Sequence, residues 1–234
     1  ILFPAMIFAG LPERLAQIRA EMARRQEAGG WAHAVTIVAV TKGFGPDAVR
    51  AALAAGLPDV GENRVQEALD KMSQVPEAGV AWHLIGHLQR NKARLVPGRF
   101  TLVHSIDSLE LAQELARRTA AVGVRQAVLV QVNMAGEEQK SGCAPADASV
   151  LAHRVAALES LALDGLMTMA PLTDEVDTQR RTFRGLRQLR DALQEEGLWL
   201  PTLSMGMSGD YATAVEEGAT VIRLGTALFG ARTA

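Results

Sequence analysis

The sequence of 234 residues contains only one cysteine, Cys143, so an internal disulfide bond is excluded. A single cysteine fits a reducing compartment, and we expect a cytoplasmic protein. No segment reaches the roughly 18 to 20 consecutive apolar residues of a membrane span, and no basic segment precedes the apolar start as in a signal peptide. The 24 basic and 26 acidic residues form no basic block. We therefore expect neither a membrane nor a nucleic-acid partner.

The residues that are abundant indicate a single α/β domain. Hydrophobic residues make up 48% of the chain and charged residues 21%, enough for a sizeable core. Apolar runs rich in β-branched residues alternate with segments of helical periodicity. The predicted strands are 35–41, 59–61, 81–85, 102–105, 127–132, 163–167, 202–204 and 221–224. Eight strand–helix units in a chain of this length predict a (β/α)8 TIM-type barrel.

The alternative fold is an open, doubly wound sheet. It is less favoured because Gly43-Phe44-Gly45-Pro46 places a proline inside the position of a dinucleotide-binding fingerprint. An extra helix at 11–27 precedes the first strand and would cover the bottom or side of the barrel. We predict an N-terminal tail at 1–10 and the barrel domain at 11–234. A long amphipathic helix is predicted at 174–196, followed by Gly197 as its capping residue.

The functional site of such a barrel forms where the strands end. Lys42 ends the first strand, and the simplest interpretation of a lysine there is a solvated side chain. If it is buried, its pKa falls and the neutral amine becomes a nucleophile toward aldehydes. Glu62, His104 and Ser105 are also expected at this rim.

Two small-residue segments near the C-terminus are candidate phosphate-binding loops. Segments 204–210 and 224–226 each lead into a predicted helix, whose first N–H groups favour an anion, although ordinary helix caps are the alternative. Arg223 alternates with Ile222 and Leu224, which are predicted to face the helices, so Arg223 is expected to point into the barrel. A structural ion pair is the alternative role for this arginine.

The histidine pair His83 and His87 does not form a predicted metal site. The two residues lie where a strand ends in glycine, and no glutamate follows His83 as a zinc-protease motif requires. We expect His87 in the site and His83 in the core with its hydrogen bonds satisfied. Cys143 has no evident base partner and is expected to be inert. The basic segment 89–94 is expected to begin a helix with a solvated face.

Eight ordered motifs stand out along the chain. They are 38–42 (VAVTK), 61–67 (GENRVQE), 82–92 (WHLIGHLQRNK), 104–108 (HSIDS), 140–142 (KSG), 165–169 (GLMTM), 205–210 (MGMSGD) and 223–230 (RLGTALFG). Together they resemble the motifs of the pyridoxal phosphate homeostasis proteins, a single-domain family related to the barrel domain of bacterial alanine racemase. The resemblance runs from about Leu11 to Arg232. One departure is Gly43-Phe44-Gly45, where relatives often carry another lysine or a proline.

The resemblance implies a cofactor and a set of residues that bind it. It implies that Lys42 forms a Schiff base with pyridoxal 5′-phosphate, and that Arg223 faces the pyridine nitrogen. The residues expected to hold the phosphate are Ser208, Gly209, Gly225 and Thr226, and those expected near the ring are Asn63 and His87. Lys140, in the predicted loop 135–140, is a candidate second docking lysine, against the simpler interpretation of an exposed side chain.

The resemblance also implies a role without turnover. An arginine at the pyridine nitrogen leaves that nitrogen unprotonated and weakens the ring as an electron sink. Racemases use a tyrosine from an added domain as second base, whereas this sequence stops at Ala234 and its one tyrosine is Tyr211. We expect a monomeric carrier that delivers the cofactor to apo pyridoxal-phosphate enzymes. An amino-acid racemase and a cofactor-free Schiff-base aldolase are the alternatives.

Overall fold

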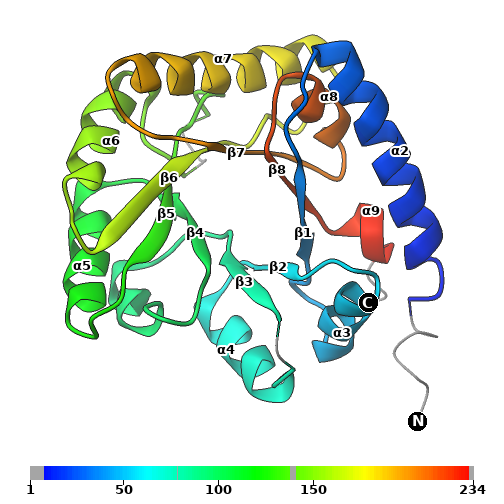
Figure 1. Cartoon of the computed structure of the whole chain (residues 1–234), viewed down its shortest axis with the longest axis horizontal. Helices are drawn as coiled ribbons and strands as arrows, with labels where there is room; N and C mark the ends of the chain where they lie inside the picture. The colour runs from blue at the N-terminus through cyan, green and yellow to red at the C-terminus, as the bar shows by residue number, and fades with distance from the viewer. Residues whose placement is uncertain (1–7, 78, 138–140, 232–234) are drawn as a thin grey trace.

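The strands of the computed structural model close into a complete barrel, and the structure describes residues 8–77, 79–137 and 141–231. Eight parallel strands follow one another around the barrel in chain order, and the last pairs with the first (Figure 1). The strands are β1 (Thr36–Val40), β2 (Asp59–Glu62), β3 (Ala81–Leu84), β4 (Leu102–Ile106), β5 (Gln126–Gln131), β6 (Leu161–Met167), β7 (Thr202–Met207) and β8 (Val221–Leu224). The predicted (β/α)8 barrel and all eight predicted strands are confirmed.

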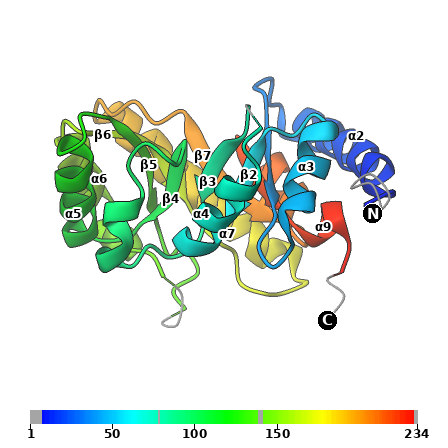
Figure 2. The same ribbon diagram turned by 90° about the horizontal axis from the view of Figure 1, so that it is seen from below.

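Helices surround the barrel on its outside (Figures 1 and 2). They are α2 (Leu11–Gly29), α3 (Pro46–Ala54), α4 (Val65–Gln74), α5 (Leu109–Ala120), α6 (Ala148–Ala156), α7 (Val176–Glu195), α8 (Tyr211–Glu216) and α9 (Thr226–Phe229), with short 3-10 helices η1 (Arg90–Leu95) and η2 (Pro145–Asp147). The amphipathic character predicted for α7 is confirmed, because Phe183, Leu186 and Leu193 are fully buried. Gly197 follows α7 with a φ of 97°, which glycine adopts readily. None of the described helices is both long and apolar enough to cross a membrane.

The extra N-terminal helix α2 covers the side of the barrel. It packs against α8 and α9, and it buries Leu11, Leu15, Ile18 and Met22. Most of the tail predicted at 1–10 lies outside the described residues. The ring of Phe8 packs edge-on against the rings of Phe44 and Phe229.

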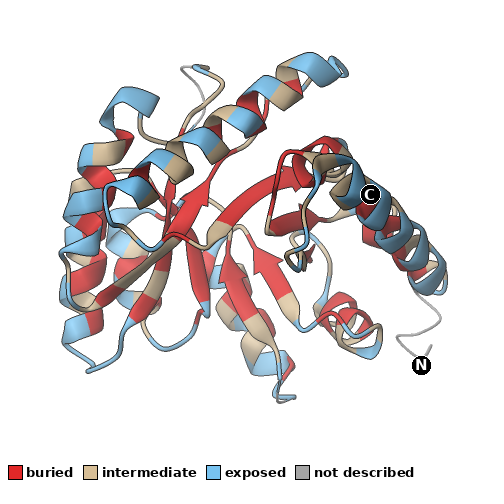
Figure 3. Ribbon diagram, turned by 45° about the horizontal axis from the view of Figure 1, so that its top comes forward, coloured by how far each residue is buried: buried red, intermediate tan, exposed pale blue. Residues whose placement is uncertain are grey.

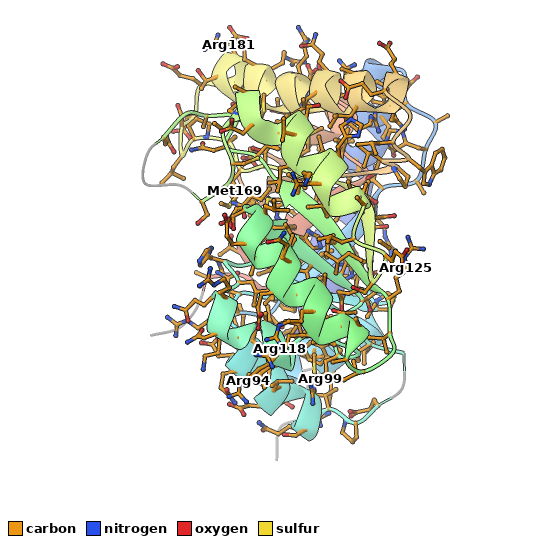
Figure 4. All side chains as sticks on the ribbon, turned by 90° about the vertical axis from the view of Figure 1, so that its left-hand side faces the viewer. Arg94, Arg99, Arg118, Arg125, Met169 and Arg181 are labelled. Atoms are coloured by element: carbon orange, nitrogen blue, oxygen red, sulfur yellow. The ribbon has the colours of Figure 1, made fainter. Side chains whose placement is uncertain are left out.

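The helix predicted to begin in segment 89–94 is instead the six-residue 3-10 helix η1. Pro97 follows closely and has no backbone N–H to donate to the preceding turn, so the helix ends here although Val96 keeps helical backbone angles. Arg94 is exposed on the outer surface of this segment (Figure 4). The expectation that the basic face is solvated therefore holds for Arg94.

Apolar side chains are buried in two separate layers. The larger lies between the strands and the helices and includes Ile222 and Leu224. The smaller consists of Leu102, Leu129 and Met167, from alternating positions that face the barrel interior. Figure 3 shows burial along the strands and on the inward faces of the helices.

Candidate functional site

A cavity of about 380 Å³ opens at the C-terminal ends of the strands. All eight residues that the family resemblance implies as cofactor-binding line this cavity: Lys42, Asn63, His87, Ser208, Gly209, Arg223, Gly225 and Thr226. They come from the ends of β1, β2, β3, β7 and β8, so the barrel closure brings together residues up to 184 positions apart, from Lys42 to Thr226. The polar residues expected at the strand ends therefore gather around a single cavity.

Lys42 is the second residue after the end of β1 and is half-buried at the cavity. Ile37 and Ala39 belong to the outer apolar layer, whereas Val40 lines the cavity, so the alternation of the strand directs Lys42 inward as well. Thr41 has the opposite direction and is fully buried. The alternation therefore directs Thr41 away from the cavity, where it anchors the backbone, and directs Lys42 toward the cavity.

The backbone before Lys42 is held by a buried ion pair. Lys71 of α4 donates to the Thr41 carbonyl at 2.7 Å and to Glu62 Oε1, which also accepts from the Thr41 hydroxyl. Glu62 is fully buried, and its Oε2 has no hydrogen-bond partner among the described residues. The expectation that Glu62 lies in the site is wrong, because Gly61 takes the inward position of β2 and Glu62 faces α4.

The predicted phosphate-binding loops meet at Ser208. Its hydroxyl oxygen accepts hydrogen bonds from the backbone N–H groups of Gly225 and Ala227, at 3.2 and 3.1 Å. These N–H groups therefore point at an oxygen acceptor. Gly209 has no left-handed backbone angle, and a Cβ built on it would meet no atom within 4 Å. Neither strain nor packing within the protein requires glycine there, and the open space suits an oxyanion held against the backbone.

The loop that carries Ser208 is itself fixed. Asp210 Oδ1 accepts from the Met207 backbone N–H at 2.5 Å. Gly206 has a φ of 94°, and a Cβ at this position would lie 2.6 Å from the Cβ of Ala214 in α8. A glycine is needed here because the loop approaches α8 so closely.

Arg223 points into the barrel, as its alternation predicts, and is 4% exposed. Nη1 donates to Ser204 Oγ at 2.6 Å, and Nη2 donates to the Thr168 carbonyl at 2.9 Å. Burial lowers the pKa of the guanidinium to about 10, an effect that Asp210 partly opposes. Arg223 is therefore a cation at neutral pH, held by two neutral acceptors.

Asn63 and His87 come from neighbouring loops that touch through Gly86. A Cβ at Gly86 would lie 2.3 Å from the Asn63 carbonyl oxygen and 2.7 Å from its Cα. The imidazole of His87 is half-exposed, and its Nδ1 lies 3.3 Å from Asp107 Oδ2. Only glycine allows the two loops to approach so closely at the cavity.

Five further residues line the cavity that were not predicted for it: Val40, Ile85, Gln131, Ser141 and Met169. The Gln131 side chain donates to the Ser141 carbonyl at 2.8 Å and so ties β5 to the following loop. Met169 is labelled in Figure 4, just beyond β6. The period-two alternation of β5, in which Leu129 faces inward, could have identified Gln131 as the next inward residue.

Two histidines lie deeper than the site. His83 is buried and bonded to Asp59 and His104, which confirms its prediction as a satisfied core residue. His104 was expected at the rim, but it is fully buried and does not line the cavity, because β4 continues to Ile106.

Burial raises the pKa of the Cys143 thiol to about 11, which agrees with its predicted inertness. Lys140 lies outside the described residues.

Comparison with known proteins first gives the class of barrel to which the chain belongs. The family described as "Alanine racemase, N-terminal domain" matches residues 14–233. An alanine racemase from Clostridium difficile has the same barrel, with a TM-score of 0.74 at 16% identity, over 91% of this chain and 59% of the racemase. At this identity the likeness shows the fold alone.

More similar proteins give the family. A pyridoxal phosphate homeostasis protein of Pseudomonas aeruginosa is 44% identical over 95% of this chain and 96% of its own length. One from Aquifex aeolicus is 40% identical over 94% and 97%. The structure of PipY from Synechococcus elongatus, with pyridoxal phosphate bound, has a TM-score of 0.82 and 37% identity over 94% of this chain and 100% of PipY. The chain belongs to the pyridoxal phosphate homeostasis protein family.

Proposed function

We propose that this protein holds pyridoxal 5′-phosphate through Lys42 and delivers it to apo-enzymes, with little or no turnover of amino acids. The observation that carries the proposal is the placement of Lys42, Arg223 and the Ser208 loop around one cavity. Relatives over nearly the full length are named for the homeostasis of this cofactor, and PipY binds it. The single cysteine supports a cytoplasmic setting, and we propose a monomer.

The residues around the cavity fit the cofactor's functional groups. Pyridoxal phosphate supplies an aldehyde that an amine can capture and a ring that withdraws electrons. The Lys42 nitrogen would bond to the aldehyde carbon with loss of one water molecule. Ser208 and the open space at Gly209 suit the phosphate, together with Gly225 and Thr226.

The proposed lack of turnover rests on what the cavity offers for proton transfer. Among its described lining residues the titratable side chains are Lys42, His87 and Arg223. Arg223 remains protonated and cannot donate a proton to a ring nitrogen at neutral pH, so the ring is a weak electron sink. The one tyrosine, Tyr211, lines a different cleft with Arg14 of α2. A racemase would need His87 as its second base.

The binding proposal is tested by absorbance and mass spectrometry of the purified protein with added cofactor. We expect a band at roughly 420 nm that borohydride removes, with a stable mass addition on Lys42. The Lys42→Ala variant should lose the reducible band, whereas Lys92→Ala, a control lysine outside the cavity, should retain it. A wild-type protein without the band, or a mass addition on another lysine in place of Lys42, contradicts the proposal. The absence of the band would favour the cofactor-free aldolase.

The lack of turnover is tested by incubating the loaded protein with L-alanine and L-serine in D₂O. We expect no appreciable exchange at Cα over hours. Rapid exchange or racemisation that His87→Asn abolishes would show that the protein is a racemase.

Delivery is tested by following reactivation of an apo-enzyme that depends on pyridoxal phosphate. We also propose Lys140 as a transient second docking lysine. Transfer from Lys140→Ala at the wild-type rate would exclude that role without affecting the role of Lys42.

A further inference from the structure

A continuous chain of hydrogen bonds crosses the barrel interior and ends on Arg223. Asp59 Oδ1 lies 2.9 Å from His83 Nε2, and His83 Nδ1 lies 2.9 Å from His104 Nε2. His104 Nδ1 lies 2.8 Å from Ser204 Oγ, which accepts from Arg223 Nη1 at 2.6 Å. These five residues, on β2, β3, β4, β7 and β8, are called the Asp59–Arg223 relay.

The relay joins the two ends of the barrel. Asp59 is the first residue of β2, at the end opposite the cavity, and its side chain is 26% exposed. His83, His104, Ser204 and Arg223 are all buried. A carboxylate near solvent at the bottom is therefore connected, through buried groups only, to the cation that lines the cavity.

The positions of the protons in the relay follow from its two charged ends. The Asp59 carboxylate can only accept, so His83 Nε2 carries a proton and, in the neutral ring, Nδ1 is an acceptor. His104 Nε2 must then donate to His83, which leaves His104 Nδ1 to accept from the Ser204 hydroxyl. The Ser204 oxygen in turn accepts from Arg223. In every hydrogen bond of the relay the donor is therefore the residue nearer to Arg223, and the acceptor is the residue nearer to Asp59.

The reverse order is unfavourable for neutral rings. It would place an unprotonated nitrogen of His83 against the carboxylate and would leave the Ser204 proton without an acceptor in the relay. Burial, together with the nearby His83 and Arg223, lowers the pKa of His104 well below its usual value. A neutral His104 in the Nε2–H tautomer therefore satisfies all of these groups at once.

We propose that His83 and His104 are positioning residues for Arg223, which act through Ser204. Among the described residues Arg223 forms no ion pair; Asp210 acts on its pKa without one, and the relay links the guanidinium to Asp59 by hydrogen bonds. Because the Ser204 hydroxyl donates to His104, its oxygen becomes a stronger acceptor for the guanidinium. The relay and the Thr168 carbonyl together hold the guanidinium in one orientation. The effect on the cofactor rests on the proposed function, whereas the proton order does not.

The proton order is tested on the protein without cofactor. The chain has only five histidines, so nitrogen-15 NMR can resolve every imidazole, with His33→Gln and His153→Gln to assign the outer ones. We expect neutral Nε2–H tautomers for both His83 and His104 at pH 7.5. An Nδ1–H tautomer or a charged ring at either position would overturn the proposal.

The positioning role is tested at the far end of the relay. Asp59→Asn removes the charge at a partly exposed position, and we expect roughly threefold weaker cofactor binding and a shift of about half a unit in the pH midpoint of the bound-cofactor spectrum. The matched control is Asp164→Asn, which removes a carboxylate that Thr202 hydrogen-bonds outside the relay. We expect this control to change neither quantity.

A pair of His104 variants separates positioning from packing. His104→Leu should change affinity and spectrum in the same direction as Asp59→Asn, and His104→Gln should restore part of the effect because its amide can both accept and donate. Wild-type affinity and spectrum in both Asp59→Asn and His104→Leu would overturn the positioning role. If the wild-type protein bound no cofactor, the proposed function would fail while the NMR experiment still decided the proton order.

Discussion

The ammonium group of Lys71 donates to the backbone carbonyl of Thr41 at 2.7 Å, directly before the lysine of the cavity. The same group pairs with the fully buried carboxylate of Glu62. The position of Lys42 is therefore fixed from the helix layer, by residues that do not line the cavity.

Replacement of Lys71 tests this support. Lys71→Met leaves the Glu62 charge buried and uncompensated, and we expect a loss of about 3 to 5 kcal/mol in the free energy of unfolding. The double variant Glu62→Gln with Lys71→Met should recover much of that loss. As control, Arg64→Met breaks an exposed ion pair with Glu67 and should cost about 1 kcal/mol or less. Urea unfolding measures all of these, and equal losses for Lys71→Met and Arg64→Met would contradict the buried-pair interpretation.

The phosphate loop is tested by Ser208→Ala. The variant removes the oxygen that accepts from Gly225 and Ala227, and a lost hydroxyl contact of about 1 to 2 kcal/mol weakens binding by roughly 5- to 30-fold. Fluorescence titration with pyridoxal phosphate measures this change. Pyridoxal, which lacks the phosphate, should bind both proteins alike, and Ser149→Ala at the surface serves as control. An equal loss of affinity for pyridoxal would assign Ser208 a different role.

The close approach of two loops at the cavity is tested by Gly86→Ala. The added methyl group would overlap the Asn63 backbone, and we expect a loss of about 1 to 3 kcal/mol together with weaker cofactor binding. Gly45→Ala is the matched control, because a Cβ there meets no atom within 4 Å. Thermal unfolding and cofactor titration of both variants give the comparison. The interpretation fails if the two variants behave alike.

A pH dependence of stability is expected from Glu216, which joins α2, α7 and α8 through Arg25 and Arg180. Hydrogen bonds from Arg180 and then Arg25 lower the pKa of Glu216 below its ordinary value of 4.5. The stabilisation is therefore complete above about pH 4.5 and is lost as the pH falls through the lower pKa of the folded state. Glu216→Gln should be less stable than wild type at pH 7, and the difference should shrink in acid. Urea unfolding of both proteins at pH 7 and at an acidic pH measures the difference in stability. A difference that stays constant between the two pH values would exclude a contribution from the lowered pKa of Glu216.

Local sequence patterns were sufficient to predict the barrel. Each strand is a short apolar run, and the inward direction of Arg223 follows from its alternation with Ile222 and Leu224 in the outer layer. Lys42 was predicted at the site because strand ends meet at one rim of a barrel. These features depend on residues close together in the chain.

The predictions that failed depend on contacts between distant segments. The outward-facing Glu62 is paired with Lys71 of α4 and accepts from the Thr41 hydroxyl, and His104 has its hydrogen-bond partners on β3 and β7. Neither partner can be identified from spacing along one strand. The short η1 has a local cause instead, because Pro97 lies three residues beyond segment 89–94 and ends the helix.

The one-way order of the Asp59–Arg223 relay limits how its residues can change in evolution. Each inner member both accepts and donates, so replacement of His83, His104 or Ser204 by an apolar residue leaves two hydrogen-bond partners unsatisfied, at least one of them buried. Another set of hydrogen-bonding residues could therefore replace this one without loss of stability only if several positions changed together. We expect these five positions to vary as a block among related proteins, although they are far apart in the sequence.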